Sequence, residues 1–339
     1  MIGAPAGGPE SGAALPAVEA RGGGGRGIHA LAVAVALWTL VLLFVGGLVT
    51  SKEAGLCVPD WPLSNGSINP PRWLQTDNLR EEHAHRLLGW VLGMLIIALA
   101  VGIQRTDPRR WMRRLGWIAL GAVCVQGVLG GYFRVVLLMH RMAIVHGVIG
   151  QGIFCLMVAL ALFTSRGWLE APPPEPVEGA RRLHRRALSA VVAVYVQVLV
   201  GALVRHSRVG HLVEYVWPHM AWGVVAAILG FAAAAEALGR HGSRPPLARP
   251  ALVLGAGLLL QVLLGLGTYF ADVDGVEEII RPPYQFWTAT AHQAAGAVVL
   301  AAAVVLYLRA RRLLAEPGSP GVAASAAVSP GPIPVRGGA

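Results

Sequence analysis

Charged side chains are scarce in this sequence. Asp, Glu, Lys and Arg make up 14% of the 339 residues, while apolar residues make up 55%. Soluble globular proteins usually carry about 25% charged residues. The three cysteines are too few for the disulfide framework of a small secreted domain, and the apolar content excludes a disordered or collagen-like chain. With these classes excluded, the remaining class is an integral membrane protein.

Eight segments contain no Asp, Glu, Lys or Arg, and each is long enough as a helix to span a hydrocarbon core of about 30 Å. They cover residues 30–51, 87–104, 115–133, 142–165, 187–204, 215–235, 250–271 and 282–308. The sequence therefore predicts an all-α integral membrane protein with eight transmembrane helices. Residues 1–27 and 311–339 are rich in Gly, Ala and Pro, and we expect them to be disordered tails.

The net charge of +10 is distributed in a way that indicates a membrane topology. Nearly all of the cations are Arg, and no nucleic-acid-binding motif accompanies them, so nucleic acid is not an expected partner. The Arg-rich stretches alternate with poorer ones and lie at 21–26, 105–114, 166–186, 240–249 and 309–312. The positive-inside rule therefore places both termini in the cytoplasm, with membrane lipid around the helices.

The chain repeats itself. VGGLVT at 45–50 resembles VGALVR at 200–205, and QGVLGGYF at 126–133 resembles QVLLGLGTYF at 261–270. We therefore expect two duplicated four-helix bundles, related as parallel repeats. Their predicted bounds are 28–165 and 187–310, joined by a cytoplasmic linker at 166–186. The longest outside loop, 52–81, has the length of a functional lid.

Four histidines open the segments that run inward from the outside: His85, His146, His219 and His292. A glycine follows each of them one helical turn later, at 89, 150, 223 and 296, and therefore shares its helix face. A glycine there leaves room for a bulky planar ligand. Two histidines on facing helices suit a haem iron with two axial imidazoles, and the repeat pairs His85 with His146 and His219 with His292.

The residues alone leave two further roles open for these histidines. Each histidine can serve packing by forming a hydrogen bond across helices. A zinc site would need a tighter cluster that includes Cys or carboxylate. Four matched positions in a duplicated bundle favour two haems.

Glu82 distinguishes the two halves. It lies three residues before His85 on the same helix face, whereas Val216 occupies the corresponding position before His219. A carboxylate at the edge of a membrane helix is costly and usually functional, although the helix dipole also favours one there. Arg86 and Arg141 lie near the outer face, where they can pair with haem propionates or extend to the interface.

Several stretches together resemble the haem A synthase family of cytochrome oxidase assembly. They are AGLCVPDWPLSNGSINPP at 54–71, EHAHRLLGWVLG at 82–93, HRMAIVHGVIGQ at 140–151 and TATAHQAAG at 288–296. The resemblance covers residues 28–310. It implies an eight-helix bacterial inner-membrane enzyme that oxidises a ring methyl of haem o to the formyl group of haem A.

The resemblance also implies roles for single residues. The substrate haem o matches His85 and His146, a haem b matches His219 and His292, and the acidic catalytic residue matches Glu82. Haem O synthase and an unidentified electron donor are the implied protein partners. Many family members carry two cysteines in the first outside loop, but this chain has Cys57 and then Ser64, so that disulfide is not expected.

Two competing functions also fit four histidines in a membrane bundle: a dihaem b-type electron-transfer cytochrome, and a haem transporter or chaperone without chemistry. The unmatched Glu82 and the long loop at 52–81 favour the enzyme.

Overall fold

The computed structural model describes residues 22–206, 212–274 and 283–318. The first part of the chain forms α1 (Gly22–Ser51), α2 (Leu79–Thr106), α3 (Arg110–Gly127), the π-helix η1 (Val128–Val136), α4 (Met142–Thr164) and the short α5 (Arg166–Leu169). The second part forms β1 (Glu175–Pro176), α6 (Ala180–His206), α7 (Leu212–His241), α8 (Pro245–Asp274), α9 (Pro283–Leu313) and β2 (Leu314–Ala315).

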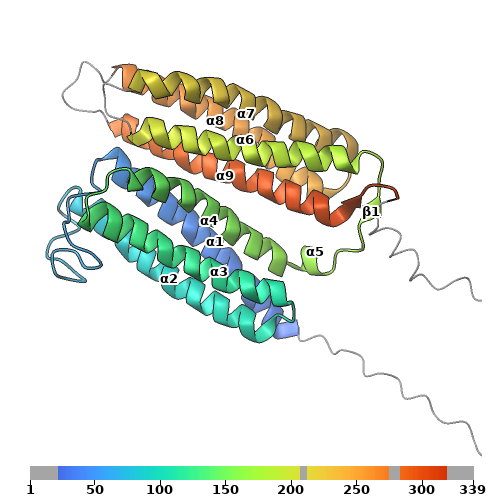
Figure 1. Cartoon of the computed structure of the whole chain (residues 1–339), viewed down its shortest axis with the longest axis horizontal. Coiled ribbons are helices and arrows are strands. Elements are labelled where there is room, and N and C mark those ends of the chain that lie inside the picture. The colour runs from blue at the N-terminus through green and yellow to red at the C-terminus, as the bar shows by residue number, and fades with distance from the viewer. Residues whose placement is uncertain (1–21, 207–211, 275–282, 319–339) are drawn as a thin grey trace, which may run out of the picture.

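Within the described residues, eight helices are long and apolar enough to cross a membrane, as the sequence predicts. They correspond to α1, α2, α3 continued by η1, α4, α6, α7, α8 and α9. Figure 1 shows that α1 begins and α9 ends at the same end of the molecule, opposite the loop that joins α1 to α2. The described part of the chain therefore starts and finishes on one side.

The helices contact one another in two groups (Figure 1). The first group comprises α1 to α4, with a core of larger side chains such as Leu99, Ile103 and Met157. The second comprises α6 to α9, and its core is dominated by alanines such as Ala190, Ala233 and Ala303. Small residues let helix backbones approach closely inside a membrane.

The two groups pack together through α1 and α4 on one side and α6 and α9 on the other. The Ser51 and Thr290 hydroxyls lie 2.8 Å apart, and Arg205 donates to the carbonyl of Gly47 at 2.9 Å. A Cβ on Gly47 would lie 3.1 Å from the Thr290 methyl and 3.4 Å from Gln293 Oε1. The first bundle therefore meets α9 through a glycine.

Three element boundaries differ from the expected ones. Helix α1 begins at Gly22, inside the predicted tail, and α6 begins at Ala180, inside the predicted linker. At the other end, β2 pairs in parallel with β1 from the linker, so residues 314–315 are ordered. The rest of the predicted tails, residues 1–21 and 319–339, lies outside the described residues.

Candidate functional site

The structure brings the four predicted histidines together as two pairs. The ring centroids of His85 and His146 lie 6.5 Å apart with their planes at 79°. Those of His219 and His292 lie 6.2 Å apart with their planes at 74°. The pairing is the one expected from the repeat, since each bundle contributes one histidine from each of two helices.

Each histidine ring rests against a glycine on the preceding helical segment. A Cβ added to that glycine would lie 2.6 to 3.1 Å from the ring's Cε1 atom. The seats are Gly46 for His85, Gly130 for His146, Gly201 for His219 and Gly265 for His292. Sequence reasoning missed these four glycines. The signal was present, since every one of them lies in a repeated motif.

The glycines that follow the histidines by one turn have a different role from the expected one in three cases. A Cβ on Gly150, Gly223 or Gly296 would lie 3.0 to 3.1 Å from a glutamine side-chain nitrogen. The space beside these three therefore holds a glutamine. Beside Gly89 no such atom lies within 4 Å in the described part of the chain, so only this glycine borders open space.

The geometry of both pairs fits two imidazoles on one haem iron. An imidazole nitrogen binds a transition metal at about 2 Å, so two imidazoles on opposite sides of one metal atom have centroids roughly 6 Å apart. His146 Nδ1 lies 3.2 Å from the main-chain carbonyl oxygen of Gln126. A hydrogen bond from Nδ1 to that oxygen leaves Nε2 free to bind a metal. No group of three or more His, Cys, Asp or Glu suited to a protein-only metal site occurs among the described residues.

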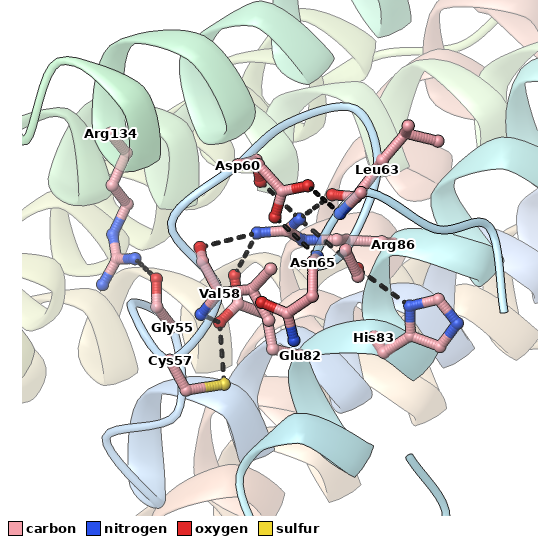
Figure 2. Close-up of polar contacts among 12 residues, drawn as sticks. Gly55, Cys57, Val58, Asp60, Leu63, Asn65, Glu82, His83, Arg86 and Arg134 are labelled. Atoms are coloured by element: carbon pink, nitrogen blue, oxygen red, sulfur yellow. Dashed lines mark hydrogen bonds and ion pairs between the residues drawn. The ribbon is translucent and has the colours of Figure 1, made fainter. Parts of the chain in front are cut away.

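Glu82 lies in the first turn of α2, and only 3% of its surface is exposed. Three donors approach its carboxylate (Figure 2). Oε2 accepts from the Cys57 thiol at 3.1 Å and from the Val58 N–H at 3.2 Å. Oε1 pairs with the Arg86 guanidinium at 2.5 Å. A buried carboxylate with such donors is compensated in its ionised form.

Arg86 holds the loop that precedes α2. Its guanidinium donates to the carbonyls of Asp60 at 2.7 Å, Val58 at 3.2 Å and Leu63 at 2.5 Å, besides its bond to Glu82 (Figure 2). Arg141, the other arginine expected near the haem propionates, has an exposed side chain just before α4. The structure thus places Arg86 among protein acceptors and Arg141 at the surface.

The loop folds around its own hydrogen bonds. The Asp60 carboxylate accepts from the N–H groups of Asn65 and Gly66, both at 2.7 Å, and both residues have positive φ, which glycine adopts readily. Partial burial pushes the pKa of Asp60 upward, but these donors and the charge of Arg86 outweigh it, so the pKa lies below its ordinary value. The turn is therefore held by an ionised Asp60 at neutral pH.

The loop is also attached to the first bundle. Ser64 Oγ lies 2.9 Å from His83 Nδ1, and Arg134 at the end of η1 donates to the Gly55 carbonyl (Figure 2). The Trp61 indole lies so close against Gly131 that a Cβ there would overlap the ring. The two positions at which many relatives were expected to carry cysteines, 57 and 64, are thus hydrogen-bonded to consecutive residues of α2.

The Cys57 thiol is expected to be unreactive although its residue is exposed. Burial of the sulfur and its hydrogen bond to the Glu82 carboxylate raise the thiol pKa from 9.0 to about 12. Because the thiolate is the nucleophile, this shift lowers the reactive fraction at pH 8 by roughly a thousandfold. N-ethylmaleimide should therefore modify Cys57 far more slowly than glutathione, measured in a variant that lacks Cys124 and Cys155. Modification at the glutathione rate would contradict the hydrogen bond.

Comparisons with known proteins agree with the resemblance drawn from the sequence. The COX15-CtaA family model, described as "Cytochrome oxidase assembly protein", matches residues 76–227. The chain is 25% identical to Heme A synthase of Sphingopyxis alaskensis over 82% of this chain and 91% of that protein. Heme A synthase of Rhizorhabdus wittichii is 24% identical over 79% of this chain and 89% of that protein.

A third relative, Heme A synthase of Bradyrhizobium sp., is 27% identical over 58% of this chain and 61% of that protein. The range matched by the family model contains Glu82, His85, His146 and His219. The first two relatives extend the similarity over most of both bundles. The chain is therefore similar to the COX15-CtaA family of cytochrome oxidase assembly proteins, with the two transmembrane bundles inside the matched range or its extensions.

Proposed function

We propose that this protein is a haem A synthase, an oxidoreductase that converts a ring methyl of haem o to a formyl group and so supplies haem A to cytochrome oxidase. One observation carries the proposal. Two histidine pairs have nearly the same geometry, yet among the residues that the structure describes a buried carboxylate, Glu82, precedes the pair of the first bundle only. A simple carrier of electrons between two equivalent haems has no use for that asymmetry.

The asymmetry supports a division of roles. His85 and His146 hold haem o, the substrate, beside Glu82. His219 and His292 hold a haem b that carries electrons. Bound haem iron supplies the oxidation chemistry, and the protein supplies two ligands to each iron together with a glycine seat for each ring.

Glu82 acts on the reacting edge of the substrate, where it stabilises developing positive charge or accepts a proton. Its bonds to Cys57, Val58 and Arg86 fix the carboxylate in position before the reaction. The same bonds hold the loop over the end of the first bundle, and a covered site excludes water. The surrounding low dielectric strengthens the effect of the charge.

The exposed Arg141 lies five residues before His146 and can pair with a haem propionate there. Arg86 would have to share its guanidinium between a propionate and its present acceptors. The proposal includes insertion in the bacterial cell membrane with both termini in the cytoplasm. Haem O synthase, which would deliver the substrate, and an electron donor are its expected partners.

The function is tested by extracting the pigments of the purified full-length protein from cells that also make haem o. We expect haem A or a hydroxylated intermediate together with haem b, and neither product from the same cells without this protein. Extraction of haem b alone would support the dihaem electron carrier instead. A protein that retained no haem would contradict both functions.

A further inference from the structure

Three of the four histidines share a structural feature that the fourth lacks. A glutamine lies four residues before the seat glycine of His146, His219 and His292, and its side chain reaches across to the histidine-bearing helix. The glutamines are Gln126 on α3, Gln197 on α6 and Gln261 on α8. On α1, the residue four positions before Gly46 is Leu42.

The amide nitrogen of each glutamine binds the main-chain carbonyl of the histidine, whereas the amide oxygen is left without a partner among the described residues. The Nε2 atoms of Gln126, Gln197 and Gln261 donate to the histidine carbonyls at 2.7, 3.0 and 2.9 Å. Their Oε1 atoms are buried without a hydrogen-bond partner among the described residues. An unpaired buried amide oxygen is costly, so its occurrence at three matched places indicates that the glutamines serve to hold the histidines.

The glutamine and the seat glycine together fix the ligand from two sides. The seat glycine lets the ring lie flat against the neighbouring helix, and the glutamine four residues earlier on that helix holds the histidine's main chain. The amide also occupies the space beside the glycine that follows the histidine by one turn. A ring held in this way stays in position to bind iron.

His85 has the glycine seat, but no such clamp is found in the described chain. Leu42 has no side-chain group that can donate a hydrogen bond, and the space beside Gly89 is open. Of the four paired histidines, His85 is the nearest in sequence to Glu82, in the half that we assign to the substrate. A substrate haem must enter and leave in each catalytic cycle, whereas a haem that only carries electrons stays bound.

We propose that Gln126, Gln197 and Gln261 are positioning residues that clamp three haem ligands. His85 faces Leu42 instead of a glutamine, and it is therefore the ligand that dissociates from the haem iron. Haem would therefore exchange at the first bundle by loss of His85 while His146 keeps its place. This inference rests on the proposed function, because it requires haem between both histidine pairs.

The test measures haem release from the full-length protein. The protein is loaded with ferric haem b as a probe, and transfer to excess apomyoglobin is followed by absorbance. We expect two phases, the faster of which disappears in His85→Ala and the slower in His219→Ala. Leu42→Gln should slow the fast phase about fivefold, the effect of one added hydrogen bond. Leu42→Met, a similar volume without a donor, is the matched control and should release haem at the wild-type rate.

Two further variants test the clamps independently of Leu42. Gln126→Leu should accelerate the fast phase, and Gln197→Leu should accelerate the slow phase, each about fivefold. The inference is overturned if Leu42→Gln releases haem as fast as Leu42→Met, or if both glutamine variants behave like the wild type. Failure of the wild-type protein to bind haem at either pair would instead contradict the proposed function itself, so the two failures are distinguishable.

Discussion

Replacing Glu82 with glutamine is expected to lower the rate of haem A formation by about 10²–10³-fold, the usual cost of removing a group that stabilises charge in a transition state. Haem should remain bound, because His85 and His146 are unchanged. Glutamine has nearly the shape of glutamate, so it can still accept from the Val58 N–H and the Cys57 thiol. What it loses is the negative charge that faces Arg86 at 2.5 Å.

The measurement is the conversion of haem o to haem A per bound haem, together with the absorption spectrum of the purified variant. Glu81→Gln is a close control, because Glu81 is also buried in the first turn of α2 but pairs with Lys52 and Arg80. We expect Glu81→Gln to keep most of the activity. A normal rate in Glu82→Gln would reduce Glu82 to an anchor for the loop and remove the main support for a catalytic carboxylate.

His292→Ala should remove the haem of the second bundle and leave that of the first. The substitution deletes one of two iron ligands and replaces the imidazole beside Gly265 with a cavity. The ratio of haem to protein should fall by about half, since one of two iron sites loses a ligand, and haem A formation should stop because the second bundle can no longer carry electrons for the oxidation. The pyridine haemochrome assay measures the first effect, and pigment extraction measures the second.

His29→Ala provides the comparison for that experiment. His29 is also a helical histidine, but its ring lies 3.2 Å from the Thr164 hydroxyl and belongs to neither pair. This variant should bind as much haem as the wild type. An unchanged haem content in both His219→Ala and His292→Ala would exclude the second pair as a haem site.

Much of the fold was predictable because membrane insertion constrains composition. A segment that crosses lipid must avoid charge over its whole length, so eight uncharged runs predicted eight helices. The histidine pairs were predicted from the sequence repeat, because equivalent residues of two repeated units are expected at equivalent places, and the structure brings the same residues together. The two-residue strands β1 and β2 could not be predicted, because so short a pair has no periodicity.

The surroundings of the histidine pairs could not be predicted from the sequence, because they depend on how the helices and the loop are placed relative to one another. That Gly46 would meet His85 depends on the rotation of α1 against α2, which local patterns do not fix. The bond from Cys57 to Glu82 depends on the path of a loop whose turn is held by Asp60. Arg86 was expected to pair with a haem propionate or to extend to the interface, because it lies near the outer face, and the loop carbonyls that it binds could not be identified without that path.

Two adjacent glycines of α1, Gly46 and Gly47, leave little more than the helix backbone between the two bundles at this point. Gly46 supports the ring of His85, while Gly47, about 100° further round the helix, faces Thr290 and Gln293, the immediate neighbourhood of His292. Little more than one backbone therefore separates the surroundings of the two histidine pairs. A side chain at Gly47 would crowd Thr290 and Gln293 of α9, so the close approach of the two proposed haem sites depends on this pair of glycines.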